Sequence, residues 1–355
     1  MFVRRSRAVS TIQVVVALAF AVSAHAQDTL RANEISLHGF ILSTYRTGDP
    51  LTVDGYRLRK ADLKFSGDVT PHMRWRISFD AAKVLTLNKK VAEINDTATL
   101  TDATLDQRSR MLQDAALTYV VDRALGFDIG QQIIPEGLEG TYSTDKVETI
   151  ERTLFVSERS RAVGLGDVRD IGASANGFVA RGVVEYHLGL FNELGESAGT
   201  TDLNPQKAVI GRIAVHPSFL PQFQFGGTGG FGGGSPVTRH ERSGGEAEFR
   251  DHGFTIRAEV MHARDGLLRR MGWYGLGAYR LNPRLQFVGR YDWCDRDLGA
   301  EEALPNALET QVTVGASYRV EGTAKLAFNV IRQEFPHITS VRSGTILLAG
   351  FSGLW

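Results

Sequence analysis

Basic side chains recur at every second position in several short stretches of this chain. Arg57 and Arg59 lie two residues apart, and the run MRWRISFDA (73–81) places Arg74 and Arg76 on one parity. A guanidinium group binds phosphate or carboxylate through two parallel hydrogen bonds and keeps its charge at physiological pH. Bases repeated along one face of an extended segment therefore indicate a surface that could bind or guide small anions.

Acidic side chains occupy the same parity as these bases, so a second interpretation is open. The further bases of this parity are Lys64, Arg257, Arg290, Arg319 and Lys325. The acids are Asp62, Asp68, Asp80, Asp114, Asp128, Glu185, Glu246, Glu248, Glu259 and Asp292. Opposite charges on neighbouring strands stabilise a sheet, so the set predicts either an anion-binding surface or a wall of ion pairs.

Motifs of other chemistries are weak. The run GGTGGFGGGS (226–235) has no lysine and opens no helix, both of which a phosphate-binding loop requires. The nine histidines lack the spacing of a zinc site, the single Cys294 excludes an intramolecular disulfide, and no Ser–His spacing suggests a hydrolase. The sequence predicts no catalytic residue, no metal site and no cofactor.

The first 26 residues are typical of a secretory signal peptide. Arg4, Arg5 and Arg7 precede a short apolar stretch, and Ala24-His25-Ala26 is a cleavage site, so we expect the mature chain to begin at Gln27. The full chain carries 40 basic and 40 acidic residues. Removal of the three arginines leaves it slightly acidic, which argues against a nucleic-acid partner.

Short alternating segments fill the rest of the chain and predict about sixteen strands. Tight turns, such as Asn176-Gly177, alternate with long polar connections, such as residues 83–110. The 329 residues left after removal of 26 from 355 give about twenty per strand and connection, which suits spanning strands of ~9–11 residues. This rhythm predicts an all-β, up-and-down antiparallel transmembrane barrel with short periplasmic turns and long extracellular loops, as one domain over residues 27–355.

Aromatic residues and the C-terminus support a membrane location. Aromatics fall mostly near strand ends, where girdles meet lipid headgroups: Tyr45, Tyr56, Trp75, Tyr119, Tyr186, Trp273, Tyr274, Tyr279, Tyr291, Trp293 and Tyr318. The closing run TILLAGFSGLW places Leu347, Ala349 and Phe351 on the parity of Trp355. Such an ending is similar to the signal by which outer-membrane barrels engage their assembly machinery.

One irregularity predicts a local defect in the second strand. Tyr56 and Leu58 share one parity, whereas Ala61, Leu63 and Phe65 share the other. Both sets can face outward only if the strand slips by one residue, so we expect a bulge near Arg59–Lys60.

Successive blocks of the chain resemble the phosphate-selective porin O/P family. The blocks are YRLRKADLKFSGDVTPHMRWRISFD, LQDAALTYVV, LGFDIGQQIIPEGLE and STDKVETIERTLF, in matching order and spacing. The resemblance implies a sixteen-stranded outer-membrane barrel of Gram-negative bacteria, usually a trimer surrounded by lipid and lipopolysaccharide. It also implies a loop folded inward to narrow the channel, and basic side chains along the path of anion-selective members.

That loop should fall at residues 135–164, which carry Lys146, Arg152, Arg159 and Arg161 among five glutamates. This mixture departs from a strongly cationic throat. The candidates for pore lining and selectivity are therefore Arg57, Arg59, Arg74, Arg76, Lys146, Arg152, Arg159, Arg161, Arg257, Arg290 and Arg319.

The sequence thus favours an outer-membrane porin without enzymatic activity that passes small hydrophilic solutes, anionic or neutral, by diffusion. A pore acts through its radius and the electrostatics of its lining. Two alternatives stay open: an outer-membrane barrel enzyme of the lipase or protease type, and a secreted, soluble all-β binding protein.

Overall fold

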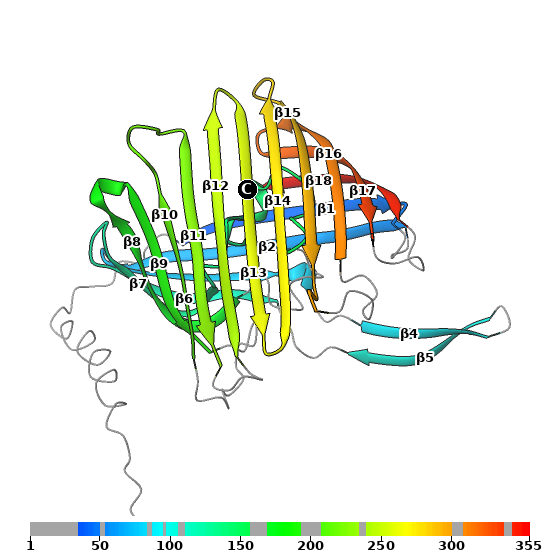
Figure 1. The fold of residues 1–355 in the computed structure, drawn as a ribbon, viewed down its shortest axis with the longest axis horizontal. Coiled ribbons are helices and arrows are strands. Elements are labelled where there is room, and N and C mark those ends of the chain that lie inside the picture. The colour runs from blue at the N-terminus through cyan, green and yellow to red at the C-terminus, as the bar shows by residue number, and fades with distance from the viewer. Residues whose placement is uncertain are drawn as a thin grey trace, which may run out of the picture. The chain divides into compact units, whose positions relative to one another are not determined.

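Sixteen strands form a closed antiparallel barrel (Figure 1). The computed structural model describes residues 35–49, 54–83, 87–94, 97–105, 111–156, 169–192, 207–233, 239–299, 308–336 and 343–355. The barrel strands are β1 (Ser36–Thr47), β2 (Gly55–Thr70), β3 (Met73–Asp80), β6 (Leu112–Val120), β7 (Gly126–Ile133), β8 (Arg169–Val179), β9 (Val184–Phe191), β10 (Ala208–Val215), β11 (Phe223–Gly232), β12 (His240–Asp251), β13 (Phe254–Asp265), β14 (Leu268–Arg280), β15 (Leu285–Asp295), β16 (Leu308–Glu321), β17 (Ala324–Glu334) and β18 (Gly344–Leu354). The predicted fold class and number of strands are confirmed, while the predicted signal peptide lies outside the described residues.

Each barrel strand pairs with its neighbour in sequence, except that β3 pairs with β6. Strands β4 (Leu87–Ile94) and β5 (Thr97–Leu105) form a separate two-stranded sheet. Our expectation of a polar connection over residues 83–110 was therefore wrong in this stretch. Thr97, Thr99 and Thr101 occupy alternate positions in this stretch, and β-branched residues favour strands. Because the stretch is polar, we had expected a loop there.

Within the described residues the helical elements are single turns: η2 (Ala81–Lys83), α2 (Leu138–Thr141), η3 (Thr144–Lys146) and η4 (Ala180–Gly182). No described helix is long and apolar enough to cross a membrane.

The tight turn expected at Asn176-Gly177 lies later in the chain. Both residues continue β8, where they pair with His187 and Tyr186 of β9. The reversal occurs in η4, where Ala180, Arg181 and Gly182 have φ angles of 51°, 60° and 91°. Left-handed backbone is costly for residues other than glycine. The sequence therefore favoured a turn at Asn176-Gly177 over one at Ala180-Arg181-Gly182, and this prediction was wrong.

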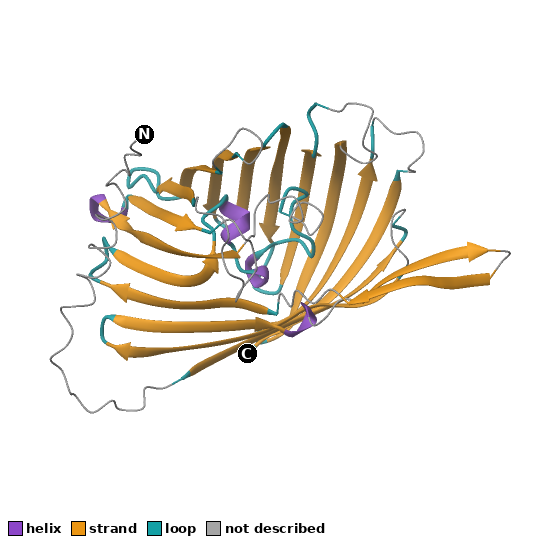
Figure 2. Ribbon diagram, turned by 90° about the horizontal axis from the view of Figure 1, so that it is seen from below, coloured by secondary structure: helices purple, strands orange, loops and turns teal. Residues whose placement is uncertain are grey.

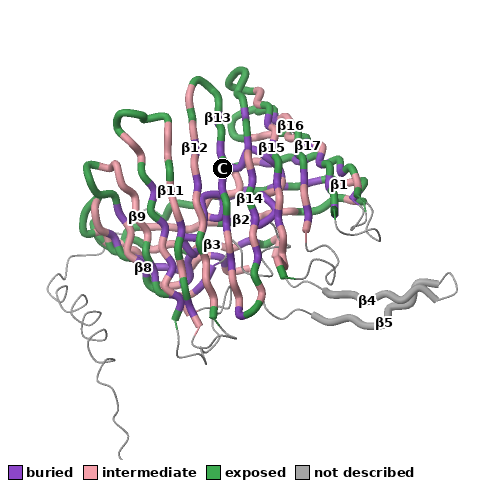
Figure 3. The backbone as a smooth tube through the Cα atoms, viewed as in Figure 1, coloured by how far each residue is buried: buried purple, intermediate pink, exposed green. Residues whose placement is uncertain are grey.

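Outside the part of the wall that residues 134–156 cover, the barrel is mostly polar inside and apolar outside. Along β13, Thr255, Arg257 and Glu259 are buried, whereas Ile256 and Val260 are exposed. The tube drawing shows the same alternation of buried and exposed positions on neighbouring strands (Figure 3). A water-soluble sheet protein buries the opposite set, so this surface suits acyl chains rather than water.

Most of the predicted aromatic set points outward. Tyr45 contacts Tyr56 with ring centroids 4.8 Å apart, and Trp273 contacts Tyr291 at 5.3 Å. Tyr274 is an exception, because it follows Trp273 and therefore faces the interior, where it is 1% exposed. Our assignment of Tyr274 to a girdle was wrong for this reason of parity.

The expected bulge and the barrel closure are both present. Leu42 pairs with Lys60 and Ser43 with Leu58, so Arg59 is the extra residue in β2. At the closure of β1 on β18, Gly39 and Trp355 exchange backbone hydrogen bonds of 2.9 and 3.0 Å. A Cβ atom at Gly39 would overlap the indole ring of Trp355, so glycine allows the terminal ring to lie over the seam.

We expect Gly39→Ala to weaken this seam. The added carbon displaces the indole ring of Trp355, which is 55% exposed and can move aside. The cost should therefore lie near the lower end of the about 1–3 kcal/mol typical of overpacking. Folded and unfolded barrels migrate differently on a gel. The variant should change from the folded to the unfolded position after heating to a lower temperature than the wild-type protein requires. Gly275→Ala is the matched control, because a Cβ there meets no atom within 4 Å. Equal transition temperatures for the two variants would contradict this role of Gly39.

Candidate functional site

After β7 the chain turns into the barrel. Residues 134–156, here called the inward segment, pack against inward-facing residues of β11, β12, β13, β15 and β17. Figure 2 shows this part of the chain, with its short helical turns, inside the ring of strands. The segment is thus bound to the inner wall.

Apolar side chains at inward positions form the floor beneath the segment. Leu154, Phe155 and Val156 pack in one cluster with Met261, Ala263, Tyr274, Leu276, Ala278, Val288 and Cys294. Ile150 packs with Ile331, Ile346 and Leu348, and Ile134 packs with Phe191, Ala208 and Ile210. The wall is therefore apolar inside where the segment covers it.

Arg257 of β13 joins the segment to the wall. Its guanidinium binds Glu148 of the segment at 3.0 and 3.1 Å and Glu248 of β12 at 2.6 Å. The Tyr142 ring lies under the guanidinium at 4.8 Å, and the Tyr142 hydroxyl donates to Glu248 at 3.3 Å. Burial, followed by the neighbouring Glu248 charge, raises the pKa of Tyr142 to about 12, so this hydroxyl keeps the proton that it donates.

Arg290 of β15 binds the segment mainly through backbone oxygens. It donates to the carbonyls of Glu151 and Arg152, both at 3.0 Å, and to the Thr149 hydroxyl at 2.7 Å. Its Nε atom binds Asp292 at 2.7 Å, while Asp292 also accepts the Leu154 N–H at 3.2 Å. The Ile150 N–H donates to Asn329 of β17 at 2.8 Å.

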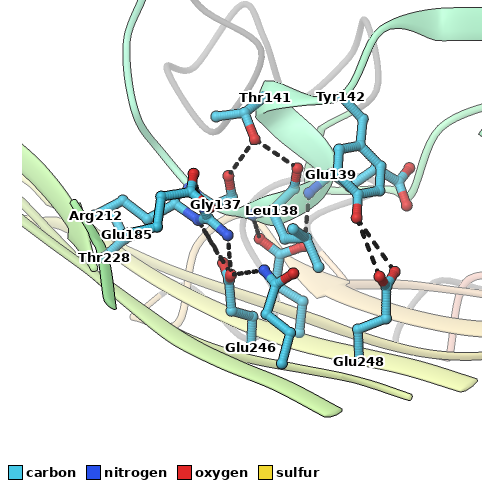
Figure 4. Close-up of polar contacts among 12 residues, drawn as sticks. Gly137, Leu138, Glu139, Thr141, Tyr142, Glu185, Arg212, Thr228, Glu246 and Glu248 are labelled. Atoms are coloured by element: carbon cyan, nitrogen blue, oxygen red, sulfur yellow. Dashed lines mark hydrogen bonds and ion pairs between the residues drawn. The ribbon is translucent and has the colours of Figure 1, made fainter. Parts of the chain in front are cut away.

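The beginning of the segment is held by β11 and β13 (Figure 4). The Gly137 N–H donates to the Thr228 hydroxyl at 3.0 Å. The Leu138 and Glu139 N–H groups donate to the two oxygens of Glu259 at 2.8 and 3.1 Å. Wall side chains thus satisfy backbone groups that the short helical turn leaves without partners.

Two further predicted site residues, Arg152 and Arg59, form hydrogen bonds or ion pairs with residues of the segment. Arg152 donates to the carbonyls of Glu139 and Tyr142, which folds the segment on itself. Arg59, at the bulge of β2, binds Glu151 at 2.5 Å. Together with Arg257 and Arg290, these candidates bind the segment rather than stand free.

Other predicted bases are more open to the interior. The Arg74 side chain is 65% exposed and pairs with Asp68 at 2.9 Å, and Arg76 is 37% exposed and pairs with Asp128 at 2.8 Å. Arg57, Lys146 and Arg319 are also exposed. Arg159 and Arg161 lie outside the described residues, as does the rest of the predicted loop beyond residue 156.

Ion pairs neutralise much of the remaining wall. Arg212 of β10 binds Glu246 of β12 with its Nε atom 3.1 Å from both carboxylate oxygens, and it binds Glu185 of β9 at 3.3 Å. Arg169 binds Asp114 at 3.2 Å. The predicted pairing of charges between strands is therefore present, and within the described ranges no cluster of side chains could hold a metal ion.

The docking position of the segment was not predicted from the sequence. The signal was present as apolar residues at inward positions, among them Met261, Leu276, Val288 and Ile331. A water-filled barrel has no need of such residues on its inner face. Their parity could have identified the covered part of the wall.

A closed barrel with an apolar outer surface and a segment bound to its inner wall defines a channel-type outer-membrane barrel. The sequence model of the family phosphate-selective porin O and P matches residues 43–209. The resemblance to this family is thereby confirmed over a stretch that includes the whole inward segment.

Solved structures share the fold at low sequence identity. The outer-membrane channel DcaP of Acinetobacter baumannii is 13% identical with a TM-score of 0.57, covering 90% of this chain and 97% of that one. OmpF of Salmonella typhi, solved with daunomycin, is 10% identical with a TM-score of 0.59, covering 91% and 98%. OmpT of Vibrio cholerae, in its trimer form, is 10% identical with a TM-score of 0.57, covering 91% and 99%. No curated protein matches the chain in sequence.

We expect Arg257→Met to destabilise the barrel strongly. Methionine preserves the bulk but leaves the buried Glu148 with no base nearer than Arg250, at 3.9 Å, whereas Arg250 still binds Glu248 at 2.6 Å. Breaking a buried pair costs about 3–5 kcal/mol. Arg332→Met is the control, because Arg332 and its partner Glu334 are both half-exposed and such pairs contribute about 0–1 kcal/mol. Urea unfolding in lipid vesicles measures both variants, and a loss below 1 kcal/mol for Arg257→Met would refute the anchoring role.

Proposed function

We propose that this protein is a general outer-membrane porin, through which small hydrophilic solutes diffuse down their gradients. The observation that carries the proposal is the inverted barrel: charged and polar side chains lie inside, and apolar side chains lie outside. The inward segment, bound to the inner wall, is suited to narrow the path. We propose residues 135–164 as the constriction that the family resemblance implies.

The charge of the inward segment favours at most a mild preference for anions. Residues 134–156 carry five acids and two bases, a formal net charge of −3. Several wall arginines are neutralised by this segment, whereas Arg57, Arg74, Arg76, Lys146 and Arg319 retain exposure. We propose that these exposed bases set the selectivity and that neutral solutes and small anions, including phosphate, pass.

Export, assembly and oligomeric state belong to the same proposal. A cleaved signal over residues 1–26 would deliver the chain across the inner membrane. The last strand, which ends at Trp355, would engage the barrel-assembly machinery. Lipid and lipopolysaccharide would contact the apolar outer surface, and a homotrimer is supported by the trimer form of the Vibrio cholerae neighbour.

We propose no catalytic role. The described interior holds a dense set of ion pairs between strands and segment, and an enzyme of the lipase or protease type would need a nucleophile and a base converging at one rim. The soluble binding protein is disfavoured because large apolar side chains such as Ile256, Val314 and Phe351 are more than half exposed.

Planar-bilayer recordings test the function. We expect the purified protein to give stepwise ion conductance, with a reversal potential in a salt gradient that leans weakly towards anions. Arg74→Ala combined with Arg76→Ala should shift it towards cations, because Asp68 loses the positive charge of Arg74 and Asp128 that of Arg76. Arg332→Ala, whose side chain shares the outward parity of Phe328 on β17, should leave it unchanged. Absence of conductance would contradict the porin function, and an unshifted potential would contradict the role of the two arginines.

A further inference from the structure

We propose that Glu259 is the positioning residue of the inward segment and so sets the aperture of the channel. The inference rests on the porin function proposed above and adds the residue that fixes the constriction. Glu259 lies on β13 and is 3% exposed. Its two carboxylate oxygens accept the consecutive N–H groups of Leu138 and Glu139.

The backbone at this point is built for a close approach. Gly137 has a φ angle of +72°, a left-handed conformation that favours glycine. A Cβ atom at Gly137 would overlap Oε1 of Glu259. Glycine therefore lets the chain run directly against the carboxylate, and any other residue would hold the segment away from the wall.

Glu259 depends on the segment for its own stabilisation. Its direct neighbour across the β12–β13 pair is Glu246, another carboxylate, and like charges in this arrangement repel. Arg212 binds Glu246, but among the described residues no basic side chain forms an ion pair with Glu259. A buried carboxylate needs hydrogen-bond donors, and the two segment N–H groups supply them.

The contacts of the segment divide into two groups. Arg257, Arg290, Asp292 and Asn329 bind residues 148–154. Glu259 and Thr228 bind residues 137–139, and Arg242 of β12 binds Glu136 at 3.1 Å, where the chain has just left β7. Loss of Glu259 would therefore loosen the backbone at Leu138 and Glu139, which lose their acceptor, while the later part of the segment remains bound.

The test compares Glu259→Ala and Glu259→Gln with Glu334→Ala and Glu334→Gln. Glutamine keeps the shape of the side chain but places an amide NH2 where one acceptor stood, so it serves even where alanine prevents folding. Glu334 is half-exposed on β17, where it pairs with Arg332 at 3.2 Å. Two readouts are needed: amide hydrogen exchange of residues 134–142 in the folded barrel, and single-channel conductance with the size limit for neutral polymers.

We expect the amide hydrogens of residues 134–142 to exchange faster in both Glu259 variants. Their single-channel conductance should vary instead of showing one uniform level, and larger neutral polymers should enter the channel. The Glu334 variants should match the wild-type protein. Unchanged exchange and an unchanged polymer limit in a folded Glu259→Gln barrel would overturn the inference. If the wild-type protein does not conduct but exchange still rises, the porin proposal fails while the positioning role of Glu259 is upheld.

Discussion

The hydrogen-bonding needs of the backbone govern this structure. In hydrocarbon an unpaired N–H or C=O group costs several kcal/mol, so a sheet can cross a membrane only when its first strand pairs with its last. Here β1 pairs with β18 from Phe40–Leu354 to Thr47–Leu347. Closure fixes the inner and outer faces of every strand, and the inverted burial of polar and apolar side chains follows from it.

A second constraint acts on the inner side of the barrel, because the backbone N–H and C=O groups of the inward segment also need hydrogen-bond partners. These groups lie away from the regular ladder, and wall side chains satisfy them: Glu259 and Asp292 accept N–H groups, while Arg290 donates to carbonyls. The charged interior thus has two uses. Part of it holds the segment, and part of it, including Arg74 and Arg76, remains exposed to the lumen.

Ion pairs limit how strongly such a channel can select. A guanidinium that is bound on both sides by carboxylates, as Arg257 is by Glu148 and Glu248, presents little charge to a passing solute. The acidic inward segment reduces the positive charge further. Selectivity in this architecture therefore depends on the few bases with exposed side chains rather than on the total number of arginines.

The sequence was most informative where one periodicity applied over many residues. Alternation and turn spacing predicted all sixteen barrel strands, and the parity change between Leu58 and Ala61 located the bulge at Arg59. It was least informative where a contact joins distant parts of the chain. The bond between Leu138 and Glu259 spans 121 positions, and no local pattern encodes it. The β4–β5 hairpin was not predicted, because its threonines are polar and suggested a connecting loop.

Spin-label accessibility along β3 tests the central claim most directly. Nitroxides would be placed singly at residues 74, 75, 76 and 77 through cysteine, in a Cys294→Ala background, with the barrel in lipid vesicles. The inverted barrel predicts that labels at 75 and 77 collide with lipid-soluble oxygen and labels at 74 and 76 with a water-soluble nickel chelate. The reverse pattern, or equal access to the chelate at all four positions, would contradict a barrel that faces lipid outside and water inside.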